Sequence, residues 1–285
     1  MPGKTTADAL QAALRRHKAG DLAAAEELYR RILIDDPRHA GALHLLGVAA
    51  LQRGRFDDAI ETIGKAIAIN GSMPEFHNNL GEAHRAKGDL GRAAAYYRRA
   101  LVLKQEYPEA HYNLGIALRK QGKPDEAAAH FLQAVTLNPS FAQAHNDLGN
   151  ALQGQGRIDE ALECYQRAVS LKPDFTEAYN NLGAALHGKG RLEEAAANFR
   201  QAATLNPGFA EPHYNLGLAL HGLGRLDEAI THYRQALALK PAYADACRSL
   251  GLALKELGRT EEALACYDQG LKTGPTDGLK ILHAT

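Results

Sequence analysis

The amino-acid sequence predicts an all-α solenoid, in which helical hairpins that share one pattern stack along the chain. Glycine, alanine and proline recur among its 285 residues with a period of 34. Glycine holds two places in that period, at Gly47, Gly81, Gly115, Gly149, Gly183, Gly217 and Gly251, and at Gly20, Gly54, Gly88, Gly122, Gly156, Gly190, Gly224 and Gly258. One spacing shared by several places indicates a repeat array rather than one or two compact domains.

Each period contains two amphipathic stretches. With Thr176 as position 1 and Phe209 as position 34, apolar or small residues occupy positions 3, 4, 7, 8, 10 and 11. They occupy positions 17, 20, 21, 24, 27, 28 and 30 as well. Both sets follow the i, i+3, i+4, i+7 spacing of a helix that buries one face. Each unit is therefore predicted to contain two helices.

Two residues are expected to end these helices. Gly190 at position 15 supplies the permissive backbone that turns the chain after the first helix. Pro207 at position 32 ends the second helix, because a residue that precedes proline avoids helical geometry. Gly71 and Gln105 replace this proline in two units, where we expect looser junctions. Each unit is thus a helical hairpin.

The period divides the chain into eight units and two tails. The units span approximately residues 6–39, 40–73, 74–107, 108–141, 142–175, 176–209, 210–243 and 244–277, and together they form the array 6–277. Residues 1–5 are an N-terminal tail. Residues 278–285 include the apolar Leu279, Ile281 and Leu282 and are interpreted as the start of a missing cap or of a following domain. Self-association through uncapped ends, or a tail that folds back, are the alternatives.

Small residues are predicted where the two helices of a unit meet. Gly183 at position 8 and Ala195 at position 20 leave only a hydrogen and a methyl group between the helices. Helices packed in this way can approach to the short end of the 8–10 Å range of interaxial distances. This close approach offsets the low helix propensity of glycine.

The pattern of one unit closely resembles the tetratricopeptide repeat (TPR) family. The residues that carry it are Tyr179, Leu182, Gly183, Leu186, Gly190, Ala195, Phe199, Ala202 and Pro207. The array is similar to the TPR superhelix of O-GlcNAc transferase-like proteins. The resemblance implies a right-handed superhelix of about eight helix-turn-helix units, with the first helix of each unit on the concave side.

The face opposite the packed side of the first helix comprises positions 2, 5, 6, 9, 12 and 13. Position 6 carries a polar residue in each of units 3 to 7: Asn79, Asn113, Asp147, Asn181 and Asn215. In the transferase family such amides bind the main chain of an extended peptide, which suits a group that both donates and accepts. The alternative is that these amides only satisfy hydrogen bonds between neighbouring helices.

Two further positions extend this candidate peptide-binding face. Position 5 carries Asn78, Tyr112, Asn146, Asn180 and Tyr214. Position 12 carries Arg85, Arg119, His187 and His221. Amides and tyrosines together offer hydrogen bonds and apolar area, as protein-binding surfaces do. The carboxylate clamp, another binding mode of TPR proteins, requires lysine at position 5, and this sequence has none.

Composition argues against several other classes of partner. Lys plus Arg and Asp plus Glu number 33 each, so no basic excess favours nucleic acid or anionic membranes. No apolar run approaches the roughly 18 residues of a membrane span, and the N-terminus lacks the apolar core of a signal peptide. The cysteines Cys164, Cys247 and Cys266 form no CxxC pair. We therefore expect a cytoplasmic protein with buried, reduced thiols.

No sequence motif indicates catalysis or a cofactor. Phosphate-binding loops, HExxH and GxSxG patterns are missing, and His77, His111, His145 and His213 share position 4, an inward packing position. We therefore expect no enzyme activity, metal or cofactor. The predicted function is a scaffold that binds a protein or an extended peptide. The alternative is the substrate-recruiting region of an O-GlcNAc transferase-like glycosyltransferase whose catalytic domain lies outside this chain.

Overall fold

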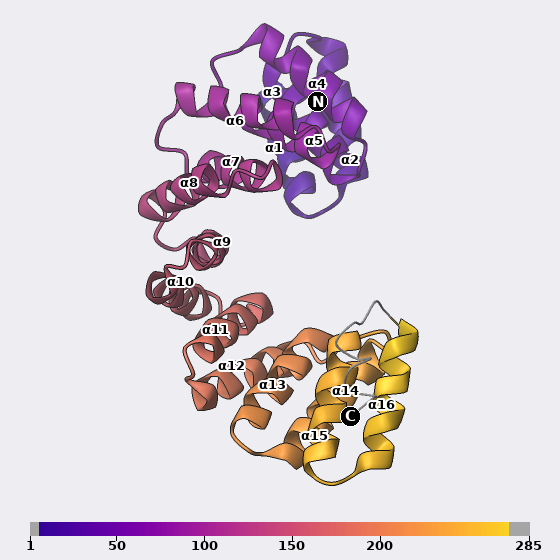
Figure 1. Cartoon of the computed structure of the whole chain (residues 1–285). Coiled ribbons are helices and arrows are strands. Elements are labelled where there is room, and N and C mark those ends of the chain that lie inside the picture. Colours follow the sequence, from indigo (N-terminus) through magenta and orange to yellow (C-terminus); the bar gives the residue numbers. More distant parts are fainter. Residues whose placement is uncertain (1–5, 274–285) are drawn as a thin grey trace. The chain divides into compact units, whose positions relative to one another are not determined.

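The chain folds into α-helices joined by short turns (Figure 1). The computed structural model describes residues 6–273, and within them sixteen helices and no strand occur. The helices are α1 Thr6–Lys18, α2 Leu22–Asp35, α3 Ala40–Gln52, α4 Phe56–Ile69, α5 Pro74–Ala86, α6 Leu90–Leu103, α7 Pro108–Lys120, α8 Pro124–Leu137, α9 Ala142–Gly154, α10 Ile158–Leu171, α11 Thr176–Gly188, α12 Leu192–Leu205, α13 Ala210–Gly222, α14 Leu226–Leu239, α15 Ala244–Glu256 and α16 Thr260–Thr273. The predicted all-α class is confirmed, and residues 1–5 and the tail 278–285 lie outside the described residues.

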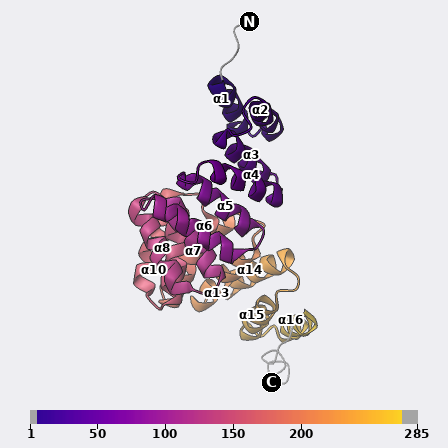
Figure 2. The same ribbon diagram turned by 90° about the horizontal axis from the view of Figure 1, so that it is seen from above.

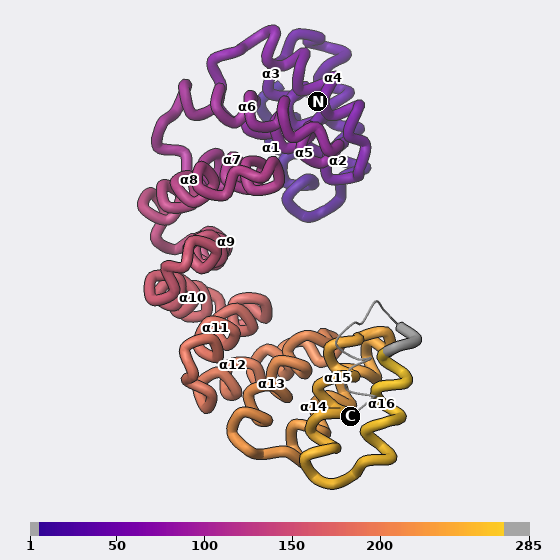
Figure 3. The backbone as a smooth tube through the Cα atoms, in the orientation of Figure 1, coloured from indigo at the N-terminus to yellow at the C-terminus, as the bar shows by residue number. Residues whose placement is uncertain are grey.

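Successive helices pair as hairpins. The chain forms two compact units, Met1–Ser140 with α1 to α8 and Phe141–Thr285 with α9 to α16. In the backbone trace, a short turn joins the two helices of each hairpin (Figure 3). The last pair, α15 and α16, lies side by side in both views (Figures 1 and 2). Each compact unit therefore holds four hairpins.

The turn inside each hairpin depends on glycine. Gly190 has φ +74°, in the left-handed region that side chains with a Cβ rarely adopt. Its N–H donates to the carbonyl of His187 at 2.9 Å, and the N–H of Arg191 donates to the carbonyl of Leu186 at 3.0 Å. These two bonds form a Schellman motif, which satisfies the last carbonyls of α11. Glycine at position 15 has a positive φ in all eight hairpins.

The two junctions without proline are each held by a histidine. His77 forms a hydrogen bond through Nε2 with the carbonyl of Gly71 at 2.9 Å. His111 does the same with the carbonyl of Gln105 at 3.0 Å. The position-4 imidazole therefore tethers the preceding loop to the next hairpin. The junctions at Gly71 and Gln105 were expected to be looser, but this side-chain hydrogen bond holds them in place of proline.

The glycine at position 8 makes room for an aromatic ring. A Cβ on Gly183 would lie 2.7 Å from Cε1 of Phe199, a side chain that is only 2% exposed. The position-24 rings of α6, α8, α10, α14 and α16 face the corresponding glycines in the same way. Ala195 is fully buried as predicted. The space beside Gly183 is filled mainly by the ring, and this contact sets the close approach of the two helices.

Substitution of leucine at two glycines of α11 tests this contact. We expect Gly183→Leu to lower the free energy of unfolding by about 1–3 kcal/mol, because the added side chain overpacks the Phe199 site. Gly188→Leu, on the same helix, should change it by less than about 0.5 kcal/mol, because a Cβ there meets no atom within 4 Å. Urea denaturation measures both. Equal stability of the two variants would contradict the assignment.

Candidate functional site

Polar side chains on the first helices form a ladder that connects neighbouring hairpins. The position-6 amide of one hairpin donates to the position-5 oxygen of the hairpin before it. The Nδ2-to-Oδ1 distances are 3.1 Å from Asn113 to Asn78, 3.0 Å from Asn181 to Asn146 and 3.0 Å from Asn215 to Asn180. We refer to these three pairs, together with Asn79 and its partner His44, as the amide ladder. Each pair places a donor against an acceptor across two hairpins.

The two positions of the ladder differ in exposure. Asn78, Asn146 and Asn180 are 6%, 4% and 5% exposed, so little of each side chain is open to a partner, and their place in the peptide-binding face stays a prediction. The following hairpin covers these side chains and uses their oxygens. Asp147, at position 6, is also buried, at 9%. The position-6 amides Asn113, Asn181 and Asn215 are half-buried and present more of their side chains.

These amides keep unused hydrogen-bonding capacity. Asn113, Asn181 and Asn215 are half-buried, and each donates one hydrogen bond through Nδ2. Among the described residues, their Oδ1 atoms accept no hydrogen bond. An asparagine side chain has two donor hydrogens and an acceptor oxygen. Each amide can thus hold the neighbouring hairpin and still offer an acceptor to another molecule.

A histidine replaces the position-5 amide at the N-terminal end of the ladder. Nε2 of His44 lies 2.8 Å from Nδ2 of Asn79, and its ring stacks on Phe76 with centroids 4.3 Å apart. Since the amide nitrogen donates, the neutral imidazole accepts at Nε2. Burial lowers the pKa of His44 to about 4. Protonation of Nε2 would remove the acceptor and break this bond.

The two tyrosines predicted at the site pack against other rings and stay half-buried. Tyr214 lies 4.8 Å from Tyr243 and 6.0 Å from Tyr233, measured between ring centroids. Tyr112 lies 5.8 Å from Phe131. These distances are typical of tilted aromatic pairs. The rings are held in place by the fold, so Tyr112 and Tyr214 form rigid rather than adaptable parts of the face.

The position-12 residues have varied surroundings. Arg85 donates through Nε to Glu82 at 3.0 Å, and His221 is bonded through Nε2 to Glu256, also at 3.0 Å. The guanidinium of Arg119 lies 5.8 Å from the ring centroid of Phe131. His187 is half-buried and makes no hydrogen bond within the described part of the chain. Of the four predicted residues, His187 is the one that the fold leaves unpaired.

Sequence reasoning missed the carboxylates that accompany these residues. Glu82 binds Arg85 and accepts a hydrogen bond from the hydroxyl of Tyr97 at 3.0 Å. Glu211 accepts from Nδ2 of Asn180 at 3.0 Å. The repeat register could have identified them, because Glu211 and Glu82 occupy positions 2 and 9 of the predicted binding face, and Glu256, the partner of His221, occupies position 13. The face is therefore a network of amides, rings and paired charges.

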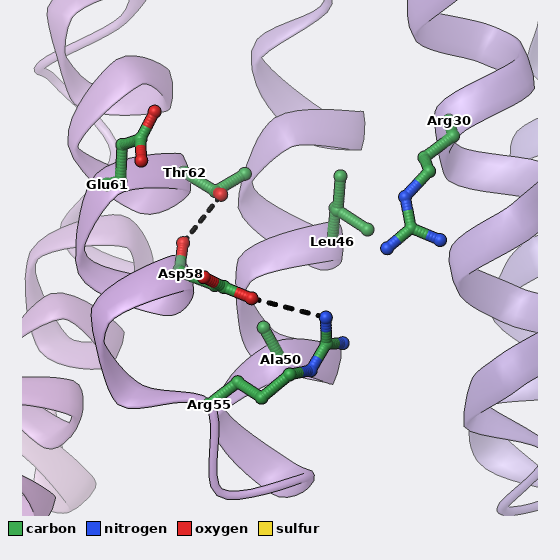
Figure 4. A pocket seen from close by; sticks show the side chains of 7 residues that line it. All are labelled: Arg30, Leu46, Ala50, Arg55, Asp58, Glu61 and Thr62. Atoms are coloured by element: carbon green, nitrogen blue, oxygen red, sulfur yellow. Dashed lines mark hydrogen bonds and ion pairs between the residues drawn. The ribbon is translucent and has the colours of Figure 1, made fainter.

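A cavity lies away from the ladder, between α2, α3 and α4 (Figure 4). It has a volume of about 210 Å³ and is lined by Arg30, Leu46, Ala50, Arg55, Asp58, Glu61 and Thr62. The buried Glu26 beside it, 2% exposed, binds Arg30, Arg53 and Arg55. Burial opposes ionisation of Glu26, but hydrogen bonds and charge from Arg55 and Arg30, with charge from Arg53, lower its pKa. Because Arg55 also binds Asp58, these cations are already paired, and the cavity is not a strong anion site.

The described residues offer neither a cluster of metal ligands nor a membrane-spanning helix. No group of three or more His, Cys, Asp or Glu side chains there could hold a metal ion. No helix in the described part combines the length and the apolar character that a membrane crossing requires.

Sequence models of one family match almost the entire chain. Models described as tetratricopeptide repeat match residues 16–80, 66–111, 78–143, 112–152 and 246–279, and a model described as TPR repeat matches 154–190, 185–224 and 223–258. The chain belongs to the TPR family. Its hairpins are thus TPR units, and the array is a TPR solenoid. A specific relation to O-GlcNAc transferase stays a prediction.

Solved structures of TPR proteins resemble this array. YrrB, described as a TPR protein with an unusual peptide-binding site, is 28% identical, with a TM-score of 0.59, and the match covers 66% of this chain and 97% of YrrB. MamA is 27% identical, with a TM-score of 0.51 and coverage of 56% and 94%. The APC/C hetero-tetramer Cut9–Hcn1 has a TM-score of 0.65 and coverage of 92% and 52%, but its 18% identity supports the fold alone. The TPR architecture and these neighbours support a protein–protein interaction scaffold.

The TPR array should lose stability as the pH falls from 7 to 4. Folded His44 binds fewer protons than unfolded His44 between its lowered pKa of about 4 and the ordinary 6.5, so stability rises with pH in this window. A pKa difference of about 2.5, at about 1.4 kcal/mol per pH unit, corresponds to stability on the order of 3 kcal/mol that is present at neutral pH and lost in acid. Urea denaturation at several pH values measures the slope.

Two variants that each lack one histidine test whether His44 causes this pH dependence. We expect His44→Gln to flatten the pH dependence of unfolding, because its side chain cannot take up a proton. His187→Gln removes a half-buried histidine outside the ladder bonds and should retain the slope of the wild type. An unchanged slope in His44→Gln would contradict the role of His44.

Proposed function

We propose that this TPR array is a non-catalytic scaffold that binds an extended peptide segment of a partner protein along the amide ladder. The observation that carries the proposal is the recurrence of a half-buried position-6 amide with an unused Oδ1. An extended peptide presents main-chain N–H groups along its length, and a free Oδ1 can accept from them whatever the side chains are. The ladder would thus supply affinity that is independent of the peptide sequence.

The spacing of the ladder suits an extended ligand. Neighbouring packed helices lie on the order of 10 Å apart, and an extended chain rises about 3.3 Å per residue. Amides on two successive hairpins, such as Asn181 and Asn215, would therefore match anchoring points about three peptide residues apart. Tyr112 and Tyr214 would add apolar contact area between anchors, and His187 would add a hydrogen-bonding group.

The hydrogen bonds between hairpins are compatible with peptide binding. Asn113, Asn181 and Asn215 each use one Nδ2 hydrogen for the neighbouring hairpin, and this bond fixes the orientation of the free Oδ1. A fixed acceptor loses little conformational entropy when a ligand binds, which favours affinity. The peptide-binding site named in the description of YrrB is consistent with this use of a TPR surface.

Removal of three ladder amides tests the proposal. Peptides would first be selected from a random library displayed on phage, and their Kd values measured by fluorescence anisotropy. In the variant Asn113→Ala, Asn181→Ala, Asn215→Ala we expect binding to weaken by about 10- to 100-fold. Lost hydrogen bonds contribute about 0.5–1.5 kcal/mol each, and 1.4 kcal/mol corresponds to a factor of ten.

The matched control removes three amides from the same hairpins on the opposite surface. Gln133, Gln201 and Gln235 are exposed at position 26, and their replacement by alanine should leave the Kd unchanged. N-methylation of the peptide backbone, which removes N–H donors, should weaken binding to the wild type. Single variants of Asn113, Asn181 and Asn215 replace the triple variant if it unfolds. Wild-type affinity in the folded ladder variants would refute the proposal.

A further inference from the structure

The cavity between α2, α3 and α4 lies where two side chains of the second hairpin are small. Ala50 occupies position 11 of the first helix and Thr62 occupies position 23 of the second helix, and both line the cavity. In the other seven hairpins position 11 carries a larger side chain, namely Arg16, His84, Leu118, Leu152, Leu186, Leu220 or Leu254. The second hairpin therefore lacks volume that its neighbours supply themselves.

The third hairpin shows which kind of group fits this space. There the ring of Tyr96, at position 23, stacks on the ring of His84, at position 11, with centroids 5.3 Å apart and an interplanar angle of 10°. These two residues are the counterparts of Thr62 and Ala50. The cavity has a volume of about 210 Å³, and an engineered apolar cavity of about 150 Å³ can hold benzene. One aromatic ring with a small substituent therefore fits.

The lining of the cavity combines an apolar floor with a polar rim (Figure 4). Leu46 and Ala50 of α3 lie at its centre. Arg30 of α2 lies on one side, and Asp58 and Thr62 of α4 lie on the other. Arg30 and Asp58 are exposed, so the rim is accessible from solvent. A tyrosine side chain has the same division, because its ring is apolar and its tip is polar.

One buried donor at the cavity has no hydrogen-bond partner. Arg55 donates through Nη1 to Asp58 at 3.2 Å and through Nη2 to Glu26. Its Nε is buried and makes no hydrogen bond among the described residues, whereas buried polar groups in folded proteins almost always have a partner. Because the charge of Arg55 is already paired, a neutral acceptor suits this donor better than an anion. The hydroxyl oxygen of a phenol is such an acceptor.

We propose that this cavity binds the side chain of a tyrosine from a partner protein. The ring fills the space over Leu46 and Ala50, and the hydroxyl oxygen accepts a hydrogen bond from Nε of Arg55. The guanidinium group of Arg30 packs on the ring at the rim, a contact that arginine commonly makes with aromatic faces. Positions 11 and 23 lie outside the ladder face, so this site is independent of the proposed peptide binding.

Titration of the full chain, labelled with ¹⁵N, with N-acetyltyrosinamide tests the proposal by NMR. Both ends of this probe are blocked as amides, as they are in a tyrosine within a protein chain. We expect saturable shifts of the backbone amides of α2, α3 and α4. N-acetylphenylalaninamide lacks the hydroxyl group and should bind about 2- to 10-fold more weakly, because it accepts no hydrogen bond from Arg55 through its side chain.

Two variants that each replace alanine by leucine provide the matched comparison. Ala50→Leu introduces the side chain that five other hairpins carry at position 11, so the fold should tolerate it, and we expect the filled cavity to lose the shifts. Ala95→Leu adds the same volume at an exposed position of α6 and should bind the probe as the wild type does. Circular dichroism confirms that each variant is folded.

A second filled variant keeps the test decisive if Ala50→Leu unfolds. Thr62→Tyr introduces the counterpart of Tyr96 and should also abolish the shifts. The proposal would be overturned by a wild type without saturable shifts, by equal affinity for the two probes, or by wild-type binding in a folded variant with a filled cavity.

Discussion

The hairpins depend on one contact, in which an aromatic ring of the second helix packs on the backbone of the first helix at a glycine. Gly183 and Phe199 show it: the ring occupies the space where a Cβ would lie. The same contact links packing to the candidate binding face, because tyrosine hydroxyls extend beyond the glycine. The hydroxyl oxygen of Tyr165 lies 2.8 Å from Oδ1 of Asn150 and 2.9 Å from Oε1 of Gln153, and it donates its hydrogen to one of them at a time. A buried ring thereby fixes polar side chains on the opposite side of the helix.

The amide ladder contributes both to the stacking of the hairpins and to the proposed binding of a peptide. Its buried position-5 oxygens depend on the next hairpin for a donor, and its position-6 amides are oriented by that bond. A substitution at position 6 therefore affects both the stacking of hairpins and the proposed ligand contacts. For this reason binding has to be compared among variants that are shown to be folded, with an equal number of amides removed elsewhere.

Two adjacent positions of the first helix contact different neighbours. Positions 4 and 5 follow each other in the sequence, but about 100° of helix rotation separates them. Position 4 consequently faces the second helix of its own hairpin, and position 5 faces the next hairpin along the ladder. Two consecutive residues of one short helix can thus pack within a hairpin and link it to the next.

Much of the fold could be read from the sequence, because glycine and proline act through local geometry. The period predicted the hairpins, the turn at Gly190 and the buried Gly183 without knowledge of any contact. The register could not reveal that Asn78 is covered while Asn113 keeps a free oxygen. Nor could it show that His77 holds a junction that lacks proline. Those outcomes depend on which hairpin covers which side chain, and that is a property of stacked units which only the tertiary structure decides.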